Sequence, residues 1–196
     1  MTLQKAECVI DGFYDMFESH NEYFGEHLGF KNFLLIFFGL LTDIIVLTFL
    51  ARWVHYGGTW RFIIAFTLTY ILHLICLTLF QFRPPENNQL WESPGFPSLT
   101  IPYNNRGDFY FSMVPAVCIL VFQEFRAQGQ KILMCLSILA LIGDFYLIMI
   151  LKGHYSIDLF GGLILGDYCW LISNNYLCYY VDVKILGLTL HERFDN

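Results

Sequence analysis

The chain has 196 residues, of which 56% are hydrophobic and only 14% are charged, and its mean hydropathy is +0.51. A water-soluble protein of this size needs more polar surface than these residues supply, so the composition excludes an ordinary soluble domain and predicts a surface that faces lipid. The net charge of −6 and the lack of a basic stripe in the sequence exclude nucleic acid as a partner.

The six cysteines are scattered and form no Cys-x-x-Cys pair. This pattern predicts neither a metal site nor a disulfide framework. Most of them lie inside apolar runs, where cysteine behaves as a small hydrophobic residue. We therefore expect no metal and no cofactor.

Residues 1–30 combine apolar side chains at roughly helical spacing with acidic residues between them, as Phe13 and Phe17 lie among Asp11 and Asp15. The pattern predicts one amphipathic helix on a membrane surface or on a partner protein. Helices that lie on lipid are usually rich in Lys and Arg on their polar face, and this segment is not. A protein partner is therefore favoured.

Five apolar stretches follow, each close to the ~20 residues that cross a hydrocarbon core of about 30 Å. They predict transmembrane helices at residues 33–53, 60–81, 108–125, 132–151 and 155–181. The sequence thus predicts an all-α protein, a multi-pass transmembrane bundle over residues 31–184. The amphipathic segment precedes this bundle, and a polar tail at residues 185–196 follows it.

The connection between the second and third stretches, residues 82–107, is long and rich in Pro, Asn and Gly. A connection of this length in a compact protein is more often functional than idle. Counting the crossings places it on the same membrane face as the turn Lys152-Gly153-His154. The starts of the third and fifth stretches are therefore predicted to meet.

The segment Gly153-His154-Tyr155-Ser156-Ile157-Asp158-Leu159 carries the clearest chemical pattern. At the start of a helix, i,i+4 spacing places His154 and Asp158 on one face. An aspartate that accepts a hydrogen bond from one imidazole nitrogen fixes the tautomer and leaves the other nitrogen to attack phosphorus. Taken alone, such a pair is more often a polar pair at a helix end than a catalytic site.

This segment resembles the final motif of sphingomyelin synthases and of plant phosphatidylcholine:diacylglycerol cholinephosphotransferases, which are relatives of the type 2 phosphatidic acid phosphatases. In those families the motif opens the last transmembrane helix, as it is predicted to do here. Their earlier motif is partly matched by Gly107-Asp108-Phe109-Tyr110-Phe111-Ser112. The resemblance covers roughly residues 60–180 and implies the fold of a membrane lipid phosphatase or phosphotransferase.

The resemblance implies that His154 attacks the head-group phosphorus and that Asp158 orients it. It also implies head-group binding by four further side chains, Arg106, Asp108, Ser112 and Tyr155. The family histidine that protonates the leaving alkoxide is matched here by Val114, which has no proton to give. General acid assistance is typically worth about 10²–10⁴ in rate, so this replacement predicts a chain without the family's catalysis.

Three aspartates, Asp43, Asp144 and Asp167, fall inside apolar stretches, where an ionised carboxylate is costly. They could form a proton or ion path, or they could hydrogen-bond neighbouring helices. No Lys or Arg shares their depth, so the sequence favours hydrogen bonding between helices.

Two further features predict how the bundle packs in lipid. Trp53 and Trp60 bracket a short turn, and we expect both at the membrane–water interface. Gly161-Gly162 and Gly166 give the last stretch a small-residue face for close helix packing.

The sequence favours a non-catalytic accessory subunit of a larger membrane assembly, such as a respiratory or ATP synthase complex. Its fold would be phosphotransferase-like, and its partners would be membrane lipids and other membrane subunits. One alternative is an active lipid phosphotransferase or phosphatase that acts through a phosphohistidine at His154. Another is a small transporter or ion-conducting subunit that uses the buried aspartates. A complex subunit is expected in the mitochondrial inner membrane, and an active enzyme in the ER or Golgi.

Overall fold

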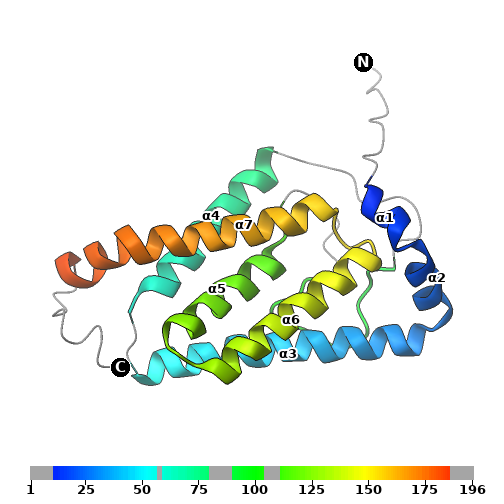
Figure 1. Cartoon of the computed structure of the whole chain (residues 1–196), viewed down its shortest axis with the longest axis horizontal. Helices are drawn as coiled ribbons and strands as arrows, with labels where there is room; N and C mark the ends of the chain where they lie inside the picture. Colours follow the sequence, from blue (N-terminus) through cyan, green and yellow to red (C-terminus); the bar gives the residue numbers. More distant parts are fainter. Residues whose placement is uncertain (1–10, 57–58, 80–89, 104–110, 186–196) are drawn as a thin grey trace, which may run out of the picture.

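The computed structural model describes residues 11–56, 59–79, 90–103 and 111–185 (Figure 1). This part of the chain is helical, and its elements in chain order are α1 Gly12–Met16, α2 Glu18–Glu26, α3 Leu28–Tyr56, α4 Arg61–Leu79, α5 Met113–Ala127, α6 Lys131–Ile150, α7 Ser156–Ile172 and the π-helical turns η1 Ser173–Leu177 and η2 Tyr180–Ile185. The predicted all-α class is confirmed for these residues.

Among the described residues, four helical segments are long and apolar enough to cross a membrane: Leu28–His55, Arg61–Leu79, Lys131–Ile150 and Ser156–Lys184. They correspond to the first, second, fourth and fifth predicted stretches. The first begins earlier than the predicted residue 33, because Lys31 does not end the helix. Its side chain is buried, and its Nζ donates a hydrogen bond to the carbonyl oxygen of Leu90 at 3.3 Å.

Helix α5 differs from the third predicted stretch. It has 15 residues, which is shorter than the ~20 that cross a hydrocarbon core. Pro115 lies in its first turn and limits extension upstream, because a proline ring deeper in a helix clashes with the carbonyl four residues earlier. Figure 1 shows α5 in the middle of the bundle, where it packs mainly on α6 and α7.

The N-terminal segment forms two short helices and not the single amphipathic helix that the pattern predicts. Phe17 separates them, with φ −108° and ψ 12°, outside the helical range. Both helices lie at one end of the bundle, α1 near the start of α7 and α2 against α3 and α6 (Figure 1). Asn21 anchors α2 there, because its amide donates to the carbonyl oxygen of Ile150 at 2.7 Å.

Small residues bring α7 against α5, as the sequence predicts. A Cβ atom added at Gly162 would collide with the backbone carbonyl oxygen of Ser112. One added at Gly166 would lie 2.8 Å from Cγ2 of Ile119 and 3.0 Å from the carbonyl oxygen of Ala116. The start of α5 therefore lies directly against the first three turns of α7.

We expect Gly162→Ala to lower the free energy of unfolding by about 1–3 kcal/mol, because the new methyl group meets rigid backbone. The measurement is the midpoint of unfolding in one detergent. Gly29→Ala is the matched control, since a Cβ at this exposed helical position meets nothing within 4 Å. Equal midpoints for both variants would contradict the close packing.

Candidate functional site

The start of α7 carries the histidine and the aspartate of the predicted site. Nδ1 of His154 lies 3.8 Å from Oδ2 of Asp158, so the two side chains face each other, although beyond direct hydrogen-bonding distance. Both are buried, with 7% of His154 and 0% of Asp158 exposed. Oδ2 of Asp158 also accepts the backbone N–H of Tyr155 at 3.1 Å. The carboxylate therefore caps α7 as well as facing the imidazole.

The start of α5 meets the start of α7, as counting the crossings predicts. The backbone N–H of Ser112 donates to the carbonyl oxygen of Asp158 at 3.1 Å. We call the set His154, Tyr155, Asp158, Ser112 and Val114 the His154 site. It joins residues from both partial motifs at one end of the bundle.

Val114 lies inside the apolar core, two residues after Ser112, which contacts the backbone of Asp158. Its side chain is 4% exposed and belongs to the same buried cluster as Leu147 and Leu159. This position therefore brings a hydrocarbon, and no proton donor, to the His154 site.

Two buried polar atoms of the His154 site make no hydrogen bond to the described residues, Oγ of Ser112 and Oδ1 of Asp158. Such atoms cost about 1–3 kcal/mol each in protein interiors, and they are uncommon outside functional sites. Of the other predicted head-group residues, Arg106 and Asp108 lie outside the described residues. Tyr155 is buried, and its ring stacks on that of Tyr14 with centroids 6.0 Å apart.

The N-terminal segment lies over the His154 site, which the sequence does not predict. The hydroxyl of Tyr14 donates to the carbonyl oxygen of His154 at 2.9 Å. The carboxylate of Asp11 accepts the backbone N–H of Ser156 at 2.6 Å and its hydroxyl at 3.0 Å. The negative charge of Asp11 is favoured at the start of α7, because the first turn of a helix carries unpaired N–H groups and a partial positive charge.

The turn between α6 and α7 also contacts the N-terminal segment, through Lys152. Lys152 has φ +55°, a left-handed conformation that residues other than glycine seldom adopt. Its Nζ lies 3.1 Å from Oε2 of Glu18 and 5.6 Å from the ring centre of Tyr14. Burial, and then the negative charge of Asp11, raise the pKa of the Tyr14 hydroxyl above its usual range, so it remains a hydrogen-bond donor at neutral pH.

An open depression of about 430 Å³ runs between α1 and the start of α7. Its lining is mostly apolar and consists of Asp11, Gly12, Phe13, Met16, Tyr155, Ser156 and Ile157. Since His154 and Asp158 are not part of this lining, the depression does not open onto the pair.

His73 also lies near this end of the bundle, although the sequence places it only as a residue inside the second stretch. It is 8% exposed, and its Nδ1 donates to the carbonyl oxygen of Phe111 at 3.0 Å. Phe111 precedes Ser112, so His73 positions the chain that enters α5.

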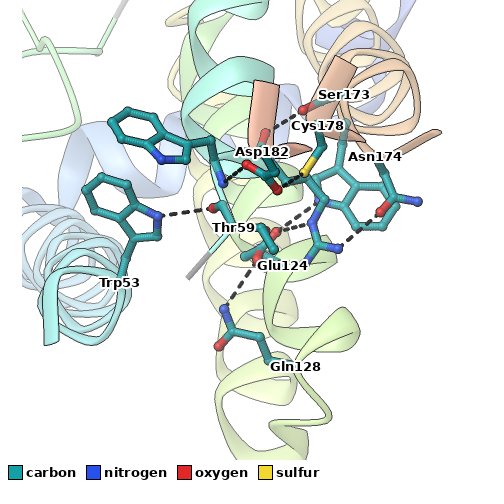
Figure 2. Close-up of polar contacts among 11 residues, drawn as sticks. Trp53, Thr59, Glu124, Gln128, Ser173, Asn174, Cys178 and Asp182 are labelled. Carbon is teal, nitrogen blue, oxygen red and sulfur yellow. Dashed lines mark hydrogen bonds and ion pairs between the residues drawn. The ribbon is translucent and has the colours of Figure 1, made fainter. Parts of the chain in front are cut away.

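A second polar cluster occupies the opposite end of the bundle (Figure 2). Nε and Nη2 of Arg61 donate to the two carboxylate oxygens of Glu124 at 2.8 and 2.7 Å. Trp170 and Gln128 each donate a further hydrogen bond to this carboxylate at 3.3 Å. The arrangement joins α4, α5 and α7 through one buried ion pair whose carboxylate is fully hydrogen-bonded.

The π-helical turns η1 and η2, which follow α7, add further polar contacts to the Arg61 end of the bundle. Nη1 of Arg61 donates to Asn174 at 3.1 Å, and the Ser173 hydroxyl donates to the carbonyl oxygen of Arg61 at 2.6 Å. The Asp182 carboxylate accepts the thiol of Cys178 at 2.9 Å and the backbone N–H of Trp60 at 3.4 Å. Single π-helical turns often mark functional positions, and here they aim polar side chains at the start of α4.

The three intramembrane aspartates have separate partners. Asp43 on α3 binds the loop at residues 98–100, and its strongest contact is the Thr100 hydroxyl at 2.6 Å. Asp144 on α6 accepts the Thr42 hydroxyl of α3 at 2.5 Å. Asp167 on α7 accepts the side-chain amide of Gln123 on α5. Each carboxylate thus links two segments of the bundle, as the hydrogen-bonding interpretation predicts.

No family model matches this sequence, and no curated protein or solved structure matches it either. The resemblance to lipid phosphotransferases therefore rests on the motif residues. Within the ranges that the structure describes, no three His, Cys, Asp or Glu side chains are grouped as metal ligands.

We expect Glu124→Ala to lower the free energy of unfolding by about 1.5–3 kcal/mol, because it removes the buried carboxylate that pairs with the partly buried Arg61 guanidinium. Replacing both residues by methionine should cost less than this single change. Glu22→Ala, at an exposed position of α2, is the control and should shift stability by less than about 0.5 kcal/mol. If Glu124→Ala and Glu22→Ala unfold at the same midpoint, the ion pair does not stabilise this end.

Proposed function

We propose that this protein is a non-catalytic subunit of a larger membrane assembly, built on a phosphotransferase-like helical bundle. The observation that carries the proposal is the packing of the His154 site. His154 and Asp158 are buried, and the N-terminal segment lies over the turn that carries His154. Val114, at the position where the resemblance implies the proton donor, lies in the apolar cluster.

The chemistry of head-group transfer explains why this packing matters. A nucleophile must approach phosphorus to about 3–3.5 Å, and the departing alkoxide must receive a proton. With 7% of His154 exposed, the imidazole has little surface to offer to a phospholipid. Val114, which the resemblance places where the leaving oxygen would be protonated, is 4% exposed in an apolar cluster and has no proton to give.

The outer surface of the bundle supports membership of an assembly. We propose that α5 is a short fifth segment held inside the bundle, surrounded by the four longer helices. Large apolar side chains are exposed on those helices, for example Phe33, Ile44, Leu79, Ile142 and Ile164. In a membrane these faces contact lipid or the helices of neighbouring subunits.

An assay of head-group exchange tests the absence of catalysis. The purified full chain, in lipid nanodiscs, is incubated with labelled phosphatidylcholine and diacylglycerol. We expect no transfer above the background of empty nanodiscs, because Val114 cannot protonate the leaving group as the family histidine does. Transfer that disappears in His154→Ala and persists in His27→Ala, at an exposed position, would overturn the proposal.

Native electrophoresis of membranes solubilised in a mild detergent tests the assembly. The chain has a mass of 22.9 kDa, and we expect its band in a complex several times larger. Harsher detergent should release the chain to its own mass, since contacts between membrane subunits depend on their apolar faces. Migration at monomer mass in the mild detergent would contradict membership of an assembly.

One observation favours an active transferase as the second candidate. The imidazole and carboxylate of the predicted nucleophile pair face each other, and two polar atoms beside them are buried without a hydrogen bond among the described residues. Polar atoms in this state are more typical of functional sites than of packing. The exchange assay separates this candidate from the first. The separate partners of Asp43, Asp144 and Asp167 weigh against a transporter.

A further inference from the structure

Helix α1 is attached to the bundle differently from helix α2. No residue of α1 is buried, whereas α2 buries Asn21 and Phe24. Phe24 belongs to the apolar cluster at this end, and Asn21 is hydrogen-bonded to Ile150. Segments with few buried apolar contacts open at lower free energy than the core to which they are joined.

The helical conformation is interrupted between α1 and α2. Phe17 leaves the helical conformation, with φ −108° and ψ 12°, and α2 starts at the next residue. Residues at element ends of this kind are where hinges absorb changes of backbone angle. The segment before Phe17 can therefore move while α2 keeps its place.

The hydrogen bonds between the α1 segment and the start of α7 are made to His154 and Ser156, which flank Tyr155. Asp11 binds the N–H and hydroxyl of Ser156, and the hydroxyl of Tyr14 binds the carbonyl oxygen of His154. The ring of Tyr14 stacks on Tyr155, and that of Phe13 lies 6.2 Å from the ring of Phe160. These contacts are polar or aromatic, and no residue of α1 is buried in the core.

We propose that residues 11–16 form a releasable cover, which hinges at Phe17 and controls access to the His154–Asp158 pair. The Asp11 and Tyr14 hydrogen bonds keep the cover closed. The ion pair of Lys152 with Glu18 fixes the start of α2, next to the hinge. This inference goes beyond the proposed function, because it concerns access to the pair and not the chemistry of the pair.

Chemical modification of histidine measures this access at single residues. The full chain in nanodiscs is treated with diethyl pyrocarbonate, and the extent of modification at each histidine is followed by mass spectrometry. His27 and His55 are exposed and report the reactivity of open imidazoles, whereas His73 is 8% exposed and reports opening of the bundle as a whole. In the unchanged protein, we expect His154 and His73 to react at least about tenfold more slowly than the exposed pair.

Loosening the cover should change the reactivity of His154 alone. A variant with Asp11→Ala and Tyr14→Phe lacks the hydrogen bonds that close the cover. Because each hydrogen bond is worth a severalfold change in an opening equilibrium, we expect His154 to react about tenfold faster. The rate at His73 should stay unchanged.

The matched control is Tyr103→Phe. Its hydroxyl also donates to a backbone carbonyl, that of Leu35 at 3.1 Å, and burial raises the pKa of this hydroxyl as it does at Tyr14. Tyr103 is not part of the cover, so we expect no change at His154. An equal acceleration in Tyr103→Phe, a parallel acceleration of His73, or full reactivity of His154 in the unchanged protein would each overturn the cover.

Discussion

The close approach of the first turn of α5 to the first turns of α7 is the constraint on which the His154 site depends. The backbone N–H of Ser112 reaches the carbonyl oxygen of Asp158, and Gly162 leaves room for the carbonyl of Ser112. This contact brings the two partial motifs together and places Val114 in the apolar cluster. It also fixes the surface on which the N-terminal segment rests.

The two ends of the bundle use polar residues in opposite ways. At the Arg61 end, a bidentate ion pair receives further hydrogen bonds from Trp170 and Gln128, so its carboxylate is fully paired inside the protein. At the His154 end, Oγ of Ser112 and Oδ1 of Asp158 have no such partners among the described residues. Complete networks rigidify a structure, whereas incomplete ones are typical of sites that serve another purpose. The Arg61 end therefore holds helices together, whereas the His154 end contains two buried polar atoms without a hydrogen bond among the described residues.

The bundle was largely predictable, because the length and apolarity of a stretch decide whether a helix can cross a membrane. Counting crossings was also sufficient to predict that α5 and α7 meet at their starts. The boundary near Lys31 was missed because its partner, Leu90, is remote in the sequence. The break at Phe17 was missed because neither proline nor glycine marks it.

The contacts between distant residues were the part that the sequence could not supply. Ser156 binds a carboxylate 145 positions away, at Asp11, and no local pattern encodes this contact. Arg61 and Glu124 are separated by 63 positions, and each lies at the border of an apolar stretch, where a charge ordinarily marks the end of a span. Only the folded bundle shows that these two charges neutralise each other.

Asp11 also has a consequence for the order in which the protein matures. Its carboxylate caps α1 through the N–H of Phe13, at 3.1 Å, and the first turn of α7 through Ser156. During synthesis Asp11 leaves the ribosome 145 residues before Ser156. The N-terminal segment therefore waits, without its final partner, until the last long helix is inserted.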